Sequence, residues 1–243
     1  MEEDPAVYRK QVESFTSQKE FYEDAAKYWD QIPATVNGML GGFACISEID
    51  VNASKRFLKA LFQAEELDVG RDYACDCGAG IGRVTGNLLS RFFNKVDLVE
   101  QNPKFLEQAK SYLKVSKSKV GEFYPIGLQD FDPEPKRYNV IWCQWVLGHL
   151  NDADLVKFFK NCKKGLKDNG ILCVKENVTK ADVVQMDPTD SSITRPYKEL
   201  VAAFDAAGYT CIKEELQTRM PDGLYPVYMF ALKPIEVTSE SSN

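Results

Sequence analysis

Asp76-Cys77-Gly78-Ala79-Gly80-Ile81-Gly82-Arg83 is the most informative stretch for the fold of this chain of 243 residues. It follows a short apolar run that begins at Tyr73 and precedes a helical pattern over Val84 to Phe93. Glycines between a strand and a helix permit a tight turn and let backbone N–H groups approach a ligand closely. The stretch therefore predicts a binding loop at the carboxyl edge of a sheet, where open α/β folds bind their ligands.

Short apolar runs alternate with helical patterns on both sides of this loop. The predicted strands are Tyr73 to Asp76, Val96 to Val99, Phe123 to Ile126, Val140 to Gln144 and Ile171 to Lys175. The helical patterns between them cover Val84 to Phe93, Pro103 to Tyr112 and Asp154 to Cys162. Such βαβ repetition implies an α/β fold with a mostly parallel sheet covered by helices on both faces. After a helix near 196–207, strand-like runs at 210–216 and 225–232 predict a C-terminal antiparallel hairpin.

The part of the chain before the first strand reads as a helical extension over residues 18–65. Aromatic residues recur at helical spacing from Gln18 to Ile32, and Pro33 ends that helix. A glycine-rich loop over 37–42 follows, and a second helix begins near Asn52. Residues 1–17 and 235–243 lack an apolar pattern and are predicted to be flexible, and a polar loop is predicted over 178–195. We expect one domain over 1–243, with this extension covering the substrate site.

Composition limits the classes of function. The net charge of −6 disfavours a protein whose affinity comes from contacts with nucleic acid phosphates. No apolar run approaches the roughly 20 residues that cross a bilayer, so no membrane partner is expected. Seven cysteines without CxxC pairs and a single histidine indicate a reducing compartment and no metal site. We expect a monomer in the cytoplasm, with the nucleus as a second location.

The spacing of the glycines distinguishes between two nucleotide cofactors. A dinucleotide site has G-x-G-x-x-G, with a helix N-terminus directed at the pyrophosphate. Here the third glycine comes one residue earlier, and Asp76 precedes the first. This spacing resembles the S-adenosylmethionine loop of the seven-strand, Rossmann-like class I methyltransferases. The resemblance implies that fold, with S-adenosylmethionine as cofactor and S-adenosylhomocysteine as product.

Polar residues at the ends of later strands support this cofactor. Glu100 ends the second strand, where a carboxylate can accept hydrogen bonds from both ribose hydroxyls. Leu128 and Gln129 follow the third strand, where the adenine would lie. Gln144 ends the fourth strand and, with Arg83, could hold the amino and carboxylate groups of the methionine moiety. Alternatively, Glu100 is a charge at a helix N-terminus and Arg83 a solvated helix residue.

A second group of residues follows the fourth and fifth strands. Trp145 and His149 come directly after the fourth strand and would stand beside the methyl group, although a lone histidine is commonly structural. Asn177 ends the fifth strand and could bind a substrate amide. Asp187 and Asp190 lie in a segment that could close over the pocket as a lid. That segment could equally be a solvated loop, because Asp, Pro and Ser favour turns.

Several motifs together resemble the protein α-N-terminal methyltransferases, and the resemblance covers residues 19–233. They are Trp29-Asp30-Gln31-Ile32-Pro33, Gly38-Met39-Leu40-Gly41-Gly42, the glycine loop, Gly127-Leu128-Gln129-Asp130-Phe131, Ile141 to Leu150, Asp190-Ser191-Ser192 and Leu224-Tyr225-Pro226-Val227-Tyr228. The resemblance implies methylation of the free α-amine of proteins that begin X-Pro-Lys after removal of the initiator methionine, ribosomal proteins among them.

The resemblance also implies a role for individual residues. Cofactor contacts would come from Gly78, Gly80, Arg83, Glu100, Gln101, Leu128, Gln129 and Gln144. Trp29, Trp145, Asn177 and Tyr225 would line the peptide channel. Leu40, Ile46 and Leu224 would form a proline pocket next to Gly41. Asp187 and Asp190, with Ser192, would receive the substrate lysine, and His149 with Asp190 would handle the proton.

The sequence departs from the family pattern in two places. Glu100 stands where animal relatives carry an aspartate, which lengthens the side chain and keeps the carboxylate. The loop over 178–187 differs in sequence and length, which bears on Asp187. Two other classes stay open: a small-molecule amine methyltransferase, which would be indifferent to peptide sequence, and a non-catalytic adaptor that binds S-adenosylmethionine.

Overall fold

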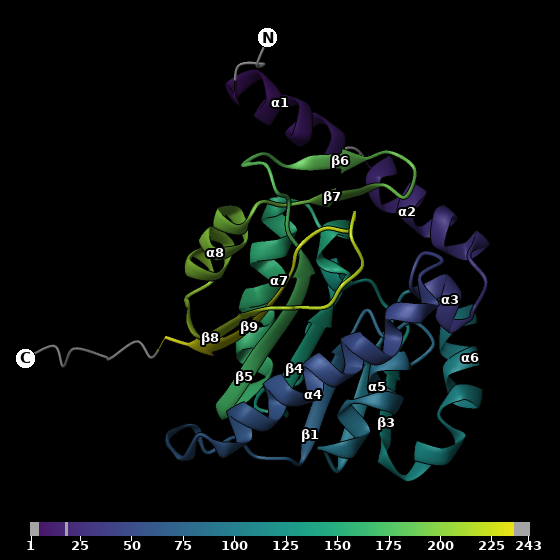
Figure 1. The fold of residues 1–243 in the computed structure, drawn as a ribbon, viewed down its shortest axis with the longest axis vertical. Helices are drawn as coiled ribbons and strands as arrows, with labels where there is room; N and C mark the ends of the chain where they lie inside the picture. Colours follow the sequence, from purple (N-terminus) through teal and green to yellow (C-terminus); the bar gives the residue numbers. More distant parts are fainter. Residues whose placement is uncertain (1–4, 18, 236–243) are drawn as a thin grey trace, which may run out of the picture.

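The structure is a computed structural model that describes residues 5–17 and 19–235. Its main sheet has the strand order β3-β2-β1-β4-β5-β9-β8 (Figure 1). The strands are β1 (Tyr73–Cys77), β2 (Lys95–Val99), β3 (Val120–Tyr124), β4 (Tyr138–Gln144), β5 (Leu166–Asn177), β8 (Tyr209–Leu216) and β9 (Val227–Pro234). β1 to β5 pair in parallel, and β9 pairs antiparallel with both β5 and β8. The predicted seven-strand fold and its C-terminal hairpin are therefore confirmed.

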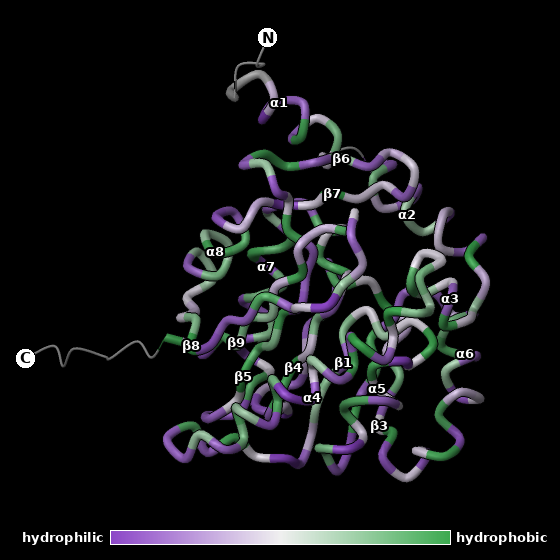
Figure 2. The backbone as a smooth tube through the Cα atoms, in the orientation of Figure 1, coloured by the Kyte–Doolittle hydropathy of each residue, from purple (hydrophilic) through white to green (hydrophobic). Residues whose placement is uncertain are grey.

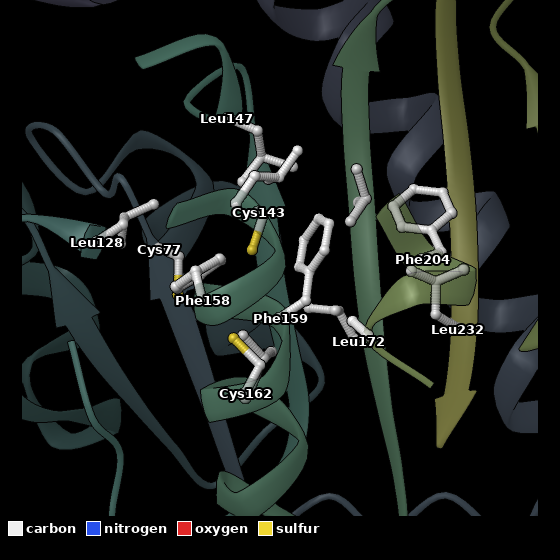
Figure 3. Packing of buried hydrophobic residues seen from close by; sticks show 14 of the residues in the cluster. Cys77, Leu128, Cys143, Leu147, Phe158, Phe159, Cys162, Leu172, Phe204 and Leu232 are labelled. Carbon is white, nitrogen blue, oxygen red and sulfur yellow. The ribbon is translucent and has the colours of Figure 1, made fainter. Parts of the chain in front are cut away.

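Helices cover both faces of the sheet. They are α4 (Ser47–Gln63), α5 (Arg83–Asn87), α6 (Pro103–Tyr112), α7 (Asp152–Gly165) and α8 (Tyr197–Ala206). Side chains alternate along each strand, so Val140 and Trp142 of β4 pack with α4 and α5, while Ile141 and Cys143 pack with α7 and α8. Figure 3 shows the α7 side, where Phe158 and Phe159 meet the strands. Burial on both faces explains the apolar runs 140–143 in β4 and 171–174 in β5.

The helices that cover the sheet show hydrophilic and hydrophobic colours in turn along their length (Figure 2). One face of each helix is buried and the other meets solvent, which is the pattern that predicts them. The predicted helix over 103–112 matches α6 from end to end. α4 begins at Ser47, five residues before the predicted start near Asn52. No helix among the described residues is both long and apolar enough to span a bilayer.

The N-terminal segment corrects one expectation. The sequence predicts flexibility over 1–17, yet residues Pro5–Thr16 form helix α1, and residues 1–4 lie outside the described part. Val12 and Phe15 of α1 pack on Val184 and Ile193, which belong to the segment over 178–195. α1 lies over the strands β6 (Gln185–Asp187) and β7 (Ser192–Thr194) in Figure 1. The C-terminal segment over 235–243, which is also predicted to be flexible, lies outside the described residues except for Ile235.

Two predicted loops contain regular structure. The polar segment over 178–195 holds the antiparallel hairpin β6–β7, in which Asp187 pairs with Ser192. The glycine-rich loop over 37–42 begins with a short helix, α3 (Val36–Met39), whose N-cap Thr35 accepts a hydrogen bond from the N–H of Gly38. Helix α2 (Glu20–Gln31) precedes it, close to the predicted bounds. The helical extension therefore consists of α2, α3, the 3-10 turn Ala44–Ile46 and α4.

Candidate functional site

One large pocket opens at the carboxyl edge of the sheet, where β1 and β4 are neighbours. The strand order changes direction there, because β2 and β3 lie on one side of β1 while β4 and β5 lie on the other. All eight residues predicted to bind the cofactor line it: Gly78, Gly80, Arg83, Glu100, Gln101, Leu128, Gln129 and Gln144. Tyr22, Ala25 and Trp29 of α2 also line it, so the N-terminal extension forms one wall of the pocket.

The glycine loop is fixed by a buried carboxylate beneath it. Asp76 accepts hydrogen bonds from the backbone N–H of Thr85 at 2.9 Å and from its hydroxyl at 2.6 Å. Burial raises the pKa of Asp76 to about 6, although both bonds from Thr85 oppose the rise. Asp76 therefore ties the end of β1 to the first turn of α5 and holds the loop between them.

Gly78 cannot be replaced without disturbing this loop. Its φ is +72°, and a Cβ there would lie 2.5 Å from the side chain of Val146. We expect Gly78→Ala to weaken S-adenosylmethionine binding by at least about tenfold, because strain and overpacking each cost roughly 1–3 kcal/mol. Calorimetric titration of the cofactor measures this. Gly41→Ala is the matched control, since φ is +56° and a Cβ there meets no atom within 4 Å. Equal affinity in both variants would contradict the expectation.

Both carboxylate oxygens of Glu100 accept hydrogen bonds from the backbone. Oε2 accepts the N–H of Gly80 at 3.0 Å, and Oε1 accepts the N–H of Asn102 at 2.8 Å. Burial raises the pKa of Glu100, and these backbone bonds oppose the rise. Asn102 is the N-cap of α6, so Glu100 does lie at a helix N-terminus, as the alternative interpretation held. Each oxygen retains a lone pair, so the carboxylate can still accept two ribose hydroxyls.

A buried ion cluster lies under the pocket floor. Asp50 of α4 accepts a hydrogen bond from Arg83 at 2.7 Å and from the amide of Gln144 at 2.8 Å. It also pairs with Lys175 of β5, whose Nζ donates to the hydroxyl of Ser54 at 2.9 Å. Arg83 is only 4% exposed, so the interpretation of a solvated helix residue is wrong. Asp50 therefore fixes both residues predicted to hold the methionine moiety.

The charges in this cluster shift the pKa values of its members. Burial alone would raise the pKa of Asp50, but the nearby Lys175 ammonium and Arg83 guanidinium lower it overall. Burial lowers the pKa of Lys175, and Asp50 counteracts part of that effect. Two cations and one anion share this buried space, so Asp50 is the group whose loss would cost most.

The loop after β4 is strained and firmly bound. Trp145 has a φ of +53°, which is unfavourable for a bulky residue and is typical of functional sites. Its indole N–H is buried and has no partner among the described residues. Glu176 of β5 accepts the N–H groups of Val146 and Leu147, both at 3.1 Å, and burial raises its pKa to about 7. The strained loop thus places Trp145 in the lining of the pocket, with its indole N–H buried.

His149 follows on a 3-10 turn and also lines the pocket. The indole Nε1 of Trp29 lies 2.9 Å from its Nε2, and the carbonyl of Ser191 lies 3.3 Å from its Nδ1. Burial lowers the pKa of His149, while the charge of Asp190 acts to raise it. The histidine therefore joins α2, the loop after β4 and the β6–β7 turn.

The predicted acidic residues lie on the β6–β7 hairpin, outside the lining of the large pocket. Asp190 accepts the hydroxyl of Ser192 at 2.6 Å, and Asp187 accepts the N–H of Thr189 at 2.8 Å. Tyr225 donates its hydroxyl to the side chain of Gln185 on β6. Asn177 ends β5 with its side chain half-buried. The structure brings Asp190 near His149 through the neighbouring Ser191 carbonyl.

The residues predicted for the proline pocket do not line the large pocket either. Leu40 and Ile46 are 7% and 5% exposed, whereas Gly41 is exposed and Leu224 half-buried. Met39, next to Leu40, is the residue of this segment that reaches the pocket. Its sulfur lies 2.6 Å from the position that a Cβ on Gly80 would take. The segment over 37–42 therefore covers the glycine loop.

Three residues that hold groups around the pocket were not predicted from the sequence: Asp50, Lys175 and Glu176. One signal was available, since Lys175 and Glu176 directly follow the apolar run 171–174 of β5 and buried charges need partners. The partner of Lys175 could not be found in this way, because Asp50 lies 125 residues earlier in the chain. The partners of Glu176 are backbone groups, which carry no sequence signal.

This chain is similar to known methyltransferases in both sequence and fold. The profile of a family described as AdoMet-dependent proline di-methyltransferase matches residues 17–233. The N-terminal Xaa-Pro-Lys N-methyltransferase 1 of Xenopus tropicalis is 48% identical over 91% of this chain and 99% of its own. The human protein of that name is 44% identical over the same shares. A solved S-adenosylmethionine-dependent methyltransferase from Leishmania major is 38% identical with a TM-score of 0.82, covering 88% of this chain and 83% of that one.

Proposed function

The chain belongs to the AdoMet-dependent proline di-methyltransferase family, and we propose that it methylates the free α-amino group of proteins that begin X-Pro-Lys. The observation that supports the proposal is that one pocket is lined by two sets of residues, those predicted to contact the cofactor and those predicted to contact the acceptor. The glycine loop with Glu100 provides the cofactor side, and Trp29, Trp145 and His149 provide a wall for an acceptor. Ribosomal proteins that begin X-Pro-Lys are among the substrates we propose.

The residues present fit S-adenosylmethionine. The loop at Gly78 leaves no room for a Cβ, so backbone N–H groups can approach a ligand there. Glu100 would accept the ribose hydroxyls, Leu128 and Gln129 would enclose the adenine, and Arg83 with Gln144 would hold the methionine moiety. When bound, the cofactor supplies an electrophilic methyl group on a sulfonium and leaves as S-adenosylhomocysteine.

The acceptor side suits a cationic peptide N-terminus. Trp29 and Trp145 offer aromatic faces that attract a methylated, permanently charged amine. The guanidinium carbon of Arg83 and the Nζ of Lys175 lie 5.6 and 5.9 Å from the centroid of the Trp145 ring, and both cations pair with Asp50, which offsets their charge. Asp187 and Asp190 on the hairpin would receive the ammonium of a lysine at the third position. Asn177, Tyr225, Leu40, Ile46 and Leu224 would complete the channel and the proline pocket.

The reaction needs a proton acceptor. An α-amine has a pKa of about 7.7–8.0 and is mostly protonated at neutral pH, so it has no lone pair with which to attack the methyl group. Asp190 and His149 are the groups we propose for removal of this proton. The pocket walls would then align the nitrogen with the methyl carbon and the sulfur.

Incubation with a Ser-Pro-Lys peptide and S-adenosylmethionine tests the proposal. We expect mass increases of whole methyl groups on the free peptide and none on the same peptide with an acetylated N-terminus, because the acetylated nitrogen is not basic. A Ser-Pro-Glu peptide is the matched control for the hairpin carboxylates. Methylation of free small amines with indifference to the peptide sequence would favour a small-molecule enzyme instead. Cofactor binding without any transfer would favour an adaptor.

A further inference from the structure

Each ring nitrogen of His149 has one hydrogen-bond partner, and each partner can act only as a donor or only as an acceptor. An indole nitrogen donates and cannot accept, so the Nε2 of His149 must accept from Trp29 at 2.9 Å. A carbonyl oxygen accepts and cannot donate, so the Nδ1 must carry the hydrogen shared with Ser191 at 3.3 Å. We infer that Trp29 is a positioning residue that fixes His149 as the neutral Nδ1–H tautomer. This inference deepens the proposed function, on which its catalytic meaning rests.

Protonation of His149 and the bond from Trp29 exclude each other. A proton added to Nε2 would point at the indole hydrogen, because an imidazolium has a hydrogen on each ring nitrogen. The indole cannot turn its donor into an acceptor, so Trp29 must leave before the histidine can take a proton. While Trp29 stays in place, the Nε2 lone pair is unavailable as a base. In this arrangement Asp190 is the one of the two proposed proton acceptors that keeps its lone pair available.

Other contacts hold Trp29 in this place. The hydroxyl of Tyr22, two turns earlier on α2, donates to Asp154 of α7 at 2.5 Å. The ammonium of Lys104 on α6 donates to the carbonyl of Asp30 at 2.7 Å. The Trp29 ring also packs edge-on against Phe105, with centroids 6.4 Å apart. The indole is thus fixed from both ends of α2, and its bond to His149 does not depend on a mobile side chain.

Charged groups surround His149 on several elements. Asp190, on the β6–β7 turn, is the one whose charge favours protonation of the imidazole. The carboxylate of Glu176 accepts N–H groups of the loop that carries His149. Arg195 donates to the carbonyls of Leu147 and Leu150 on either side of it. Among the described residues, only Trp29 and Ser191 form hydrogen bonds with the ring itself.

His149 is the only histidine in the chain, so its state can be read without assignment. The full-length protein with 15N-labelled histidine gives one pair of ring nitrogens in a long-range proton–nitrogen correlation spectrum. We expect a protonated Nδ1 and an unprotonated Nε2 that accepts a hydrogen bond, unchanged as the pH is lowered to the ordinary histidine pKa of about 6.5. Trp29→Phe keeps an aromatic ring and removes the donor. It should expose an Nε2–H population and move the titration midpoint up by about one pH unit.

Tyr22→Phe is the matched control, because it loosens α2 while leaving the indole donor in place. It should leave both nitrogen signals as in the unsubstituted protein, because the contacts from Lys104 and Phe105 still hold Trp29 beside His149. An Nε2–H tautomer in the unsubstituted protein would overturn the inference, with no variant needed. The same shift in Tyr22→Phe as in Trp29→Phe would also overturn it, since the effect would then come from displacement of the helix. Peptide methylation in the same samples reports separately on the proposed function, so failure of one does not imply failure of the other.

Discussion

Asp190→Asn should lower the turnover of a Ser-Pro-Lys peptide by about 10² to 10⁴, the usual contribution of a positioned proton acceptor. The affinity for S-adenosylmethionine should stay within about twofold, because Asp190 lies on the hairpin outside the cofactor pocket. Asparagine keeps the size of the side chain and an oxygen that can accept the Ser192 hydroxyl, which lies at 2.6 Å from Asp190. It removes the charge and the basic lone pair. Steady-state kinetics with calorimetric cofactor titration measures both quantities.

Asp187→Asn is the matched control on the same hairpin. Asp187 is exposed, and its carboxylate accepts only the N–H of Thr189 among the described residues. We expect its substitution to raise KM for peptides with lysine at the third position and to change kcat little. Loss of turnover and of cofactor affinity by the same factor in Asp190→Asn would remove the proposed role. A raised KM with little change in kcat in both variants would assign both carboxylates to lysine binding.

Asp50→Asn should lower the free energy of unfolding by about 3–5 kcal/mol, because it leaves two buried cations without their shared anion. Arg83 and Lys175 are 4% and 0% exposed, so water cannot replace the lost partner. S-adenosylmethionine affinity should fall as well, since Asp50 fixes both Arg83 and Gln144. Urea denaturation and cofactor titration measure the two effects.

The pH dependence of this effect follows from the lowered pKa of Asp50. A carboxyl whose folded pKa is depressed adds stability above its unfolded pKa of about 3.9 and loses it as the pH falls through the folded value. The stability advantage of the unsubstituted protein over Asp50→Asn should therefore be constant from about pH 8 to about pH 5 and shrink only in stronger acid. Urea denaturation of both proteins at each pH measures this difference.

Asp24→Asn is the control that removes an exposed ion pair instead of a buried one. Asp24 pairs with Lys27 at 2.8 Å on the surface of α2, where both side chains are more than half exposed. Its loss should cost about 1 kcal/mol or less, as for surface pairs in general. A cost of that small size for Asp50→Asn would mean that the buried cluster relaxes or admits water.

Local patterns predict the parts of the site that depend on nearby residues. The helix–strand alternation follows from periodicity, and α6 matches its predicted bounds because Pro103 and the N-cap Asn102 define its start. The eight residues predicted to contact the cofactor line one pocket because the carboxyl ends of parallel strands meet at one edge of the sheet. Each of these residues follows the end of a strand, and the strand ends can be found from the sequence. Their common location could therefore be predicted although the order of the strands in the sheet was not known.

The sequence does not predict helix α1, although it carries a weak signal for one. Tyr8, Val12 and Phe15 fall at helical spacing within an otherwise polar segment. The packing partners of this face include Val184 and Ile193, which lie far away in the chain. A helix of 12 residues is marginal in water by itself, so contact with the hairpin decides that it forms.

The fold class, the glycine loop and the cofactor could all be predicted from the chain alone, because each depends on residues that lie close together in sequence. The pairing of Asp50 with Arg83 and Lys175 could not, nor could the bond from Trp29 to His149, which is 120 residues away. Burial and hydrogen-bond pairing depend on which surfaces meet after folding. The same side chains in a different packing would be solvated charges and a free imidazole.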